Sequence, residues 1–296
     1  MRRRSDFPSY LALRAAVGAM HPLPRGLALR LGAALGRVAR SPLGLRRVVA
    51  DENLARAFPE LSQDARDAIC RRMFEHFGRM TVESLRVAAT GGREVLPLVR
   101  AGNVIEVVQD LLRRGRGLLV LTGHFGNWEV AAAYMASQGM PVTAVWKPQS
   151  NPWIARYLDG LRRRLSVEAI PMPEARFAVR TALAAGRVVA LVADQAPLRS
   201  DTWVPFFGQP TRTFEGPGHF AAQMGCPVLL GGMLEDGEGG YRAFAEVLAE
   251  APHGDTDEVV LRIATQYRAR LEAAVRTAPE QYLWTHRLWK TPPPDR

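Results

Sequence analysis

His124 and Glu129 are the residues of this 296-residue chain whose types and spacing point most directly to chemistry. The apolar run 118–122 before them is typical of a buried strand, the stretch 130–135 after them of a helix, and Asn127 of a helix N-cap. On one continuous helix, side chains five positions apart diverge by about 140°. We therefore expect His124 on the turn before a helix and Glu129 in its first turn, where the two can converge. A histidine oriented by a carboxylate can take a proton from a hydroxyl.

This segment resembles the first motif of the glycerolipid acyltransferases, in which His-x4-Asp/Glu follows a strand. The residues Phe125-Gly-Asn-Trp-Glu129 narrow the resemblance to the lipid A biosynthesis lauroyl/myristoyl acyltransferases, a branch that includes the phosphatidylinositol mannoside acyltransferases. Further blocks similar to this family stand at residues 51–60, 147–152, 194–195, 205–218 and 279–287. Ordered blocks from about residue 50 to 290 make the resemblance far more specific than His-x4-Glu alone.

The resemblance implies a membrane-associated enzyme at the cytoplasmic face of a bacterial inner membrane. Such an enzyme moves a fatty acyl chain from an acyl carrier protein or coenzyme A thioester to a hydroxyl of a glycolipid. The acceptor would be a lipid A precursor or, alternatively, a phosphatidylinositol mannoside or another lipid. His124 would act as general base and Glu129 would fix its tautomer, while backbone N–H groups near Gly126 and the helix start would stabilise the oxyanion. We expect no metal and no other cofactor.

Several further positions are expected to bind substrate. Lys147 follows an apolar run, and a cation there can hold a phosphate or sugar headgroup. Asp194 and Gln195 end another apolar run, and the carboxyl ends of parallel strands face the site in such sheets. By analogy with the family, the remaining substrate-binding positions are Asn127, Asn151, Phe207, Gly208, Thr213 and Arg287. The role of His286 is left open between the site and packing, and Arg162–Arg164 is interpreted as a solvated helix face.

The positive charge is concentrated at the N-terminus. Residues 1–47 contain ten arginines against Asp6 alone, and so carry +9 of the total charge of +10. The rest of the chain is nearly neutral and has no nucleic-acid-binding motif, which argues against a nucleic-acid partner. In 25–40, apolar residues interleave with the arginines at helical spacing, as Leu27, Leu31, Ala34, Leu35 and Val38. This pattern favours an anionic membrane surface over a solvated basic leader, and the run is too short to span a bilayer.

Apolar strands alternating with helices predict a single α/β domain whose mostly parallel sheet is flanked by helices, preceded by N-terminal membrane-associating helices. The expected strands are 118–122, 142–146, 167–170, 188–193, 228–233 and 241–247. The expected helices are 62–87, 151–164, 174–185, 215–224 and 256–276. The domain should cover 48–291, after a basic amphipathic segment at 1–47 and before a disordered tail at 292–296.

Two other classes of protein remain open at this point. A thioesterase could use the same histidine and carboxylate with water as the acceptor. A non-catalytic lipid-binding protein has no need of a base, so the pairing of His124 with Glu129 argues against it. The sequence contains no Gly-x-Gly-x-x-Gly after a strand, no Walker loop and no His-Glu-x-x-His, which disfavours nucleotide and zinc enzymes.

Overall fold

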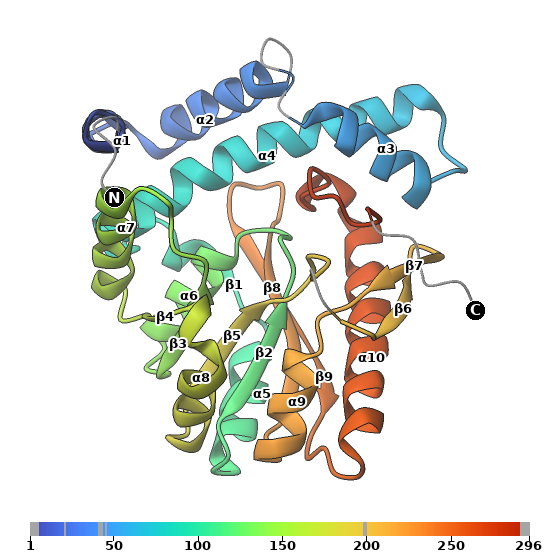
Figure 1. Ribbon diagram of the computed structural model, residues 1–296. Helices are drawn as coiled ribbons and strands as arrows, with labels where there is room; N and C mark the ends of the chain where they lie inside the picture. The colour runs from blue at the N-terminus through green and yellow to red at the C-terminus, as the bar shows by residue number, and fades with distance from the viewer. Residues whose placement is uncertain (1–5, 21, 41–43, 45, 198–199, 291–296) are drawn as a thin grey trace.

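The computed structural model describes residues 6–20, 22–40, 44, 46–197 and 200–290. The predicted tail at 292–296 lies outside the described residues. Within them the chain forms one α/β domain, in which helices cover both faces of a central sheet (Figure 1). The predicted fold class is confirmed to that extent.

The central sheet has seven strands in the order β1-β9-β8-β2-β5-β3-β4. Every neighbouring pair is parallel except β8 and β9, which are antiparallel. The strands are β1 (Val99–Arg100), β2 (Leu118–Thr122), β3 (Val142–Trp146), β4 (Glu168–Pro171), β5 (Val188–Val192), β8 (Val228–Glu235) and β9 (Tyr241–Ala249). The six predicted strands are all present, with ends shifted by at most two residues.

The strand β2 shows why the strands of this sheet appear in the sequence as uninterrupted apolar runs. Leu118 and Val120 pack toward the helices α5 (Val104–Arg113) and α6 (Trp128–Ser137). Leu119 packs into the opposite core, which also contains buried residues of α8 (Ala175–Ala184), α9 (Gly216–Met224) and α10 (Thr256–Thr277). Because successive side chains of a strand point to opposite faces, a sheet covered on both faces is apolar at every position.

The long helix α4 (Gln63–Thr90) crosses above the carboxyl ends of the parallel strands (Figure 1). The hydroxyl of Ser62 caps its N-terminus by accepting from the N–H of Ala65 at 3.2 Å. Three further helices lie around it: α1 (Asp6–Met20), α3 (Arg47–Ala57) and α7 (Pro152–Arg164). The helix α4, from the N-terminal third of the chain, therefore covers the carboxyl ends of the parallel strands (Figure 1).

The helix α2 (Arg25–Arg40) packs on α4 through glycines. A Cβ on Gly36 would lie 2.0 Å from the carbonyl oxygen of Phe74, and one on Gly78 would lie 2.1 Å from that of Gly32. Only residues without a side chain allow the two backbones to approach this closely.

The face of α2 turned away from α4 is apolar and exposed. It contains Leu27, Leu31, Leu35 and Val38, all at least 44% exposed. Several arginines instead hold α2 to α4, as in the ion pairs Arg25–Glu83, Arg37–Glu75 and Arg40–Asp67. Some of the arginines that we assigned to a membrane surface thus form ion pairs within the protein. None of the described helices combines the length and apolar character needed to cross a bilayer.

The family-like block around Phe207 forms a small hairpin of β6 (Trp203–Phe206) and β7 (Gln209–Arg212), which pair antiparallel. Phe207 and Gly208 form its two-residue turn with φ of 51° and 69°. Two consecutive positive φ angles are typical of a type I′ turn, whose twist suits a tight hairpin. The sequence analysis did not predict this hairpin.

Candidate active site

The turn between β2 and α6 carries His124, as the sequence predicted. Asn127 caps α6, with its side-chain oxygen accepting from the N–H of Val130 at 3.1 Å. Gly126 has φ of 63°, and a Cβ there would lie 2.0 Å from the carbonyl oxygen of Met233. The turn therefore requires glycine both for its backbone conformation and for its packing against β8.

Asp194, beyond the end of β5, holds the His124 ring. The Nδ1 atom of His124 lies 2.7 Å from Oδ1 of Asp194, and the backbone N–H of His124 donates to Oδ2 at 2.8 Å. Asp194 is fully buried. Burial alone would raise the pKa of its carboxyl, but the charge of His124 and its two hydrogen bonds lower that pKa to about 2. An ionised carboxylate accepts a hydrogen bond from Nδ1–H, and in a neutral ring that tautomer leaves the lone pair on Nε2 of His124.

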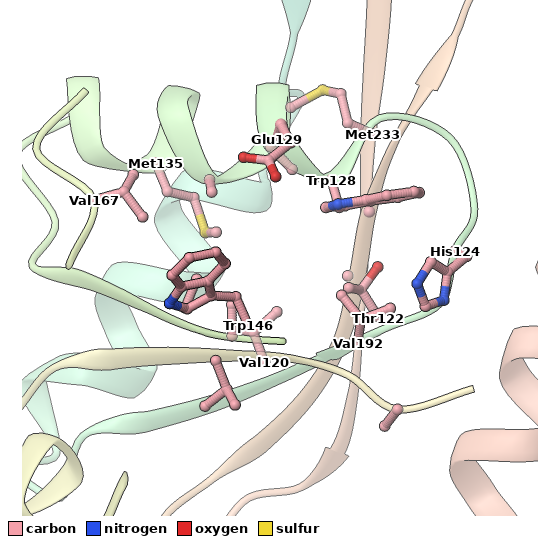
Figure 2. Close-up of a pocket in the computed structure, with 18 of the residues that line it drawn as sticks. Val120, Thr122, His124, Trp128, Glu129, Met135, Trp146, Val167, Val192 and Met233 are labelled. Atoms are coloured by element: carbon pink, nitrogen blue, oxygen red, sulfur yellow. The ribbon is translucent and has the colours of Figure 1, made fainter. Parts of the chain in front are cut away.

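Glu129 does not take the part that we expected. Its carboxylate binds Arg162, with Oε1 2.7 Å from Nη2, and the Arg162 guanidinium stacks 5.0 Å from the ring centre of Trp146. Figure 2 shows the Glu129 carboxylate directed away from His124. The predicted contact between His124 and Glu129 is therefore wrong. Arg162 is therefore an exception to the interpretation of 162–164 as a solvated face, whereas Arg163 and Arg164 are exposed as expected.

The other side of the His124 ring meets Gln195 and His286. The Nε2 atom of Gln195 lies 3.2 Å from Nε2 of His124 and 2.9 Å from Nε2 of His286. One amide group can donate to both ring nitrogens if both accept. Burial, followed by the charge of His124, lowers the pKa of His286 to about 4, so His286 is neutral near pH 7. The Gln195 amide can therefore bridge the two rings when Nε2 of each is unprotonated.

Two buried side chains of α10 fix the strand ends beneath these groups. The hydroxyl of Tyr267 donates to the carbonyl oxygen of Thr122 at 2.8 Å. The guanidinium of Arg268 donates to the carbonyl oxygen of Asp194 at 2.9 Å and to the hydroxyl of Thr213 at 3.1 Å. Thr213 is itself buried. Its predicted role in a substrate pocket is therefore wrong, and its hydroxyl instead binds Arg268. Rigid support of this kind holds a site in its working geometry.

His124 faces a cavity of about 650 Å³ between the sheet and the helices α5 and α6 (Figure 2). Its polar lining includes His124, Gln195, Glu129, Arg162 and Lys147. Most of the remaining lining is apolar and includes Val104, Ile105, Val108, Val120, Leu229 and Ala245. A histidine in the wall of a largely apolar cavity suits a reaction at one end of a long apolar group.

The family model described as bacterial lipid A biosynthesis acyltransferase matches residues 2–291. The chain belongs to this family. The expected enzyme class, an acyltransferase, is thereby confirmed.

The similar proteins fall into the two branches that the sequence indicated. The chain is 27% identical to the lipid A biosynthesis lauroyltransferase of Escherichia coli (strain K12) over 281 residues, covering 92% of this chain and 88% of that protein. It is 29% identical to the palmitoleoyltransferase of the same organism, covering 92% and 87%. It is 27% identical to the phosphatidylinositol mannoside acyltransferase of Mycolicibacterium smegmatis (strain ATCC 700084 / mc(2)155), covering 74% and 73%.

Two predicted substrate-binding residues of the acyltransferase cap helices instead, and a third does not line the cavity. Asn127 is fully buried as the cap of α6. Asn151 caps α7 by accepting from the N–H of Trp153 at 3.0 Å, and its amide donates to the carbonyl oxygen of Asp6 at 2.6 Å. Arg287 is exposed and is not among the residues that line the cavity.

The hairpin residues also lie outside the cavity of the acyltransferase. Phe207 is buried with its ring 5.3 Å from that of Phe58 and 5.4 Å from that of Trp284. Gly208 completes the turn. The predicted pocket role of both is therefore corrected to hairpin structure. Lys147, by contrast, is exposed at the cavity that His124 faces.

The backbone donors that we expected near Gly126 are already used. The N–H of Gly126 donates to the carbonyl oxygen of Gln281 at 2.9 Å, and that of Asn127 to the carbonyl oxygen of Met233 at 2.8 Å. These two groups cannot serve as oxyanion donors in this conformation, which corrects the prediction for the turn at Gly126. The donors expected at the start of α6 stay a prediction. The amide of Gln195 is a donor beside Nε2 of His124.

A buried histidine of α4, for which no function was predicted, contacts the turn that carries His124 in the acyltransferase. His76 is fully buried, with Nε2 3.3 Å from the carbonyl oxygen of Gly126 and Nδ1 3.3 Å from Oε1 of Glu235. Burial raises the pKa of Glu235, but contacts with His76 and Arg79 outweigh it and lower that pKa to about 2. No local sequence pattern identifies this residue, because its partners come from distant elements.

The described residues contain no group of three or more histidine, cysteine or acidic side chains that could hold a metal ion. The two cysteines, Cys70 and Cys226, are free thiols in the core. Burial raises the pKa of both thiols to about 11, so neither is a thiolate near pH 7. The candidate chemistry of the acyltransferase therefore centres on His124.

Proposed function

We propose that this enzyme transfers a fatty acyl chain from an acyl carrier protein or coenzyme A thioester to a hydroxyl of a glycolipid such as a lipid A precursor. The observation that carries the proposal is the orientation of His124, whose Nδ1 is bound by Asp194 while Nε2 faces an apolar cavity. The names of two relatives, a lipid A biosynthesis lauroyltransferase and a palmitoleoyltransferase, support the same acceptor class.

In this mechanism the acceptor hydroxyl takes the place of the Gln195 amide at Nε2 of His124. The ring removes the hydroxyl proton as the oxygen attacks the thioester carbonyl carbon, whose π electrons move to the carbonyl oxygen. The tetrahedral intermediate collapses, the carbon–sulfur bond breaks, and the leaving thiolate takes the proton from the imidazolium. Asp194 stabilises that imidazolium while it exists. General-base assistance of this kind contributes about 10²–10⁴-fold in rate.

The cavity suggests where the two substrates lie. The acyl chain occupies the apolar part between the sheet and α5 and α6, because burying methylene groups is favourable by about 0.8 kcal/mol each. Lys147 and Arg162 are the cations at the polar end and would hold a phosphorylated or polyhydroxyl headgroup. Glu129 serves this end of the site by orienting Arg162.

The membrane-facing surface of the proposed enzyme is the outer face of α1 and α2, at the cytoplasmic side of the inner membrane. What supports it is the exposed apolar row of Leu27, Leu31, Leu35 and Val38, continued on α1 by Phe7 and Leu11. Apolar side chains on a surface helix insert into the lipid headgroup region. Arg30 is exposed beside the row and would contact anionic lipid headgroups.

Product analysis tests this function. Purified protein is incubated with an acyl thioester and a lipid A precursor, and the masses of the lipids are measured by mass spectrometry. The proposal predicts a product heavier by one acyl chain, lost on His124→Ala. A phosphatidylinositol mannoside in place of the precursor tests the other branch, favoured by the Mycolicibacterium relative. Release of free fatty acid without an acylated lipid would identify a thioesterase, and binding without turnover a lipid-binding protein.

A further inference from the structure

A second cavity, of about 530 Å³, lies between α8 and α9. Most of its wall is apolar, as expected for a site that accepts an organic ligand. It is lined by Val145, Met172, Ala175, Arg176, Arg180, Leu191, Val192, Phe214, Gly216, His219, Phe220 and Gln223. Nothing in the proposed reaction so far uses this space.

The second cavity adjoins the one that contains His124. Four residues line both cavities: Val145, Met172, Val192 and Phe214. Val145 and Val192 lie near the carboxyl ends of β3 and β5, and the chain continues from Val192 to Asp194 and Gln195 at the catalytic base. An extended ligand that passes these four shared residues can therefore have one arm in each cavity.

The rim of the second cavity is positively charged. Arg176 is exposed, and Arg180 lies with its guanidinium 5.1 Å from the ring centre of Phe177. His219 is partly exposed, and its Nε2 lies 4.0 Å from Oε2 of Glu215. Glu215 itself is hydrogen-bonded to Ser200 and to backbone N–H groups.

None of the described residues that line the second cavity is acidic. Arginine side chains bind phosphate through paired, charge-assisted hydrogen bonds. The cavity thus combines an apolar channel with cations at its rim, which is complementary to a flexible arm that ends in a phosphate.

We propose that the second cavity binds the phosphopantetheine arm of the acyl donor, with its phosphate at Arg176 and Arg180. The inference rests on the proposed function, because that function supplies the thioester. A thioester carries two arms on opposite sides of the reacting carbonyl. The acyl arm fits the apolar cavity beneath His124, so the thiol arm must leave in another direction, and coenzyme A and acyl carrier protein share the same arm. Lys147 remains at the other cavity for the acceptor.

Inhibition by two fragments tests the phosphate contact. Pantetheine and pantetheine 4′-phosphate compete with the acyl donor, and their inhibition constants are compared in the wild-type enzyme and in Arg176→Ala/Arg180→Ala. We expect the phosphate to tighten inhibition at least about tenfold in the wild type and hardly at all in the double variant. Arg176→Ala alone should give part of this loss. Arg71→Ala, at an exposed arginine of α4 outside both cavities, is the matched control.

An equal preference for the phosphate in the wild type and the double variant would overturn the inference. Michaelis constants for decanoyl coenzyme A and decanoyl acyl carrier protein distinguish the sources of the arm. Both should rise about tenfold in the double variant, with the constant for the lipid acceptor unchanged. A rise for coenzyme A alone would assign the arginines to its nucleotide phosphates, and one for the carrier protein alone to a protein surface. A rise for the acceptor alone would assign the cavity to the lipid.

Any of these last three results would contradict the proposed arm site. Failure of the proposed function looks different, because the wild-type enzyme would then acylate no glycolipid from either donor.

Discussion

The Nδ1 atom of His124 lies 2.7 Å from Oδ1 of Asp194, although the two residues are 70 positions apart in sequence. The register of the sheet explains the contact. Thr122 of β2 pairs with Val192 of β5, and each of the two functional residues stands two positions beyond its strand's paired residue. Parallel neighbours thus bring their following residues together at the carboxyl edge of the sheet. The base and its carboxylate are held by backbone pairing rather than by one local turn.

The stability of the enzyme should fall on mild acidification because of His286. Its pKa in the folded protein is about 4, below the usual 6.5. The unfolded chain therefore binds a proton in this range before the native protein does, and stability is lost as the pH falls from about 6.5 to 4. His286→Gln keeps an acceptor for Gln195 without the titration, so its free energy of unfolding should decline less steeply, by at most about 1.4 kcal/mol per pH unit.

Urea unfolding at several pH values measures this slope. His253→Gln, at an exposed histidine, is the control. An unchanged slope in His286→Gln would show that His286 is not the group responsible.

Gly126→Ala should destabilise the catalytic turn through two separable effects. The left-handed backbone costs a side-chain-bearing residue about 1–2 kcal/mol. The added Cβ would also lie 2.0 Å from the carbonyl oxygen of Met233, and relieving such a clash typically costs about 1–3 kcal/mol more. Gly139→Ala isolates the first effect, since Gly139 has φ of 80° with open space around it. Equal losses in thermal or urea unfolding would refute the packing argument.

Much of the fold follows from the sequence because its signals are local. The strands are short apolar runs bounded by turns, and the ends of helices such as α4 and α6 are marked by the capping residues Ser62 and Asn127. The hairpin of β6 and β7 was missed because its turn places Phe207 at positive φ, where a bulky residue is uncommon. The two-residue strand β1 is defined only by its pairing with β9.

The site was predictable only where its signals are local in the sequence. His124 and the cap Asn127 depend on one turn, and the turn is visible in the sequence. The carboxylate that binds His124 depends on which strand lies beside β2, and no local pattern contains that information. Glu129 was predicted to contact His124 because the two are near in sequence. Its carboxylate instead binds Arg162, which is 33 positions away. His76 and His286 likewise come from α4 and the C-terminal segment.

Binding to anionic vesicles should depend on the apolar row of α2. Leu31→Glu/Leu35→Glu places charges on two exposed leucines and should reduce flotation with the vesicles about tenfold or more, because burying a leucine contributes about 1.5–3 kcal/mol. Leu261→Glu, at an exposed leucine of α10, is the control. Equal flotation of both variants would assign attachment to another surface.

Substitution is the better test of the membrane surface than deletion of residues 1–47. Deletion would remove Arg25 from Glu83, whose side chain is fully buried, and would leave an unpaired charge in the interior. A truncated protein that fails to float would then be hard to separate from an unfolded one.

Lys147→Ala should raise the Michaelis constant for the glycolipid acceptor by roughly tenfold, the size of one charge-assisted contact. Thioester hydrolysis should persist, because it needs the donor and His124 but no acceptor. The chain has one other lysine, Lys290, which is exposed and outside both cavities, so Lys290→Ala is a matched control. If transfer and hydrolysis fall together, Lys147 serves the donor side or the fold.

The central claim is that Asp194, and not Glu129, orients the base. Turnover by Asp194→Asn and Glu129→Gln, measured side by side with the same donor and acceptor, tests it most directly. An amide at 194 can donate to Nδ1 and favour the wrong tautomer, so Asp194→Asn should lower kcat by roughly 10²–10⁴-fold. Glu129→Gln can still accept from Arg162 and should lower kcat less than about tenfold. Near wild-type turnover in Asp194→Asn, with turnover abolished in Glu129→Gln, would contradict this account.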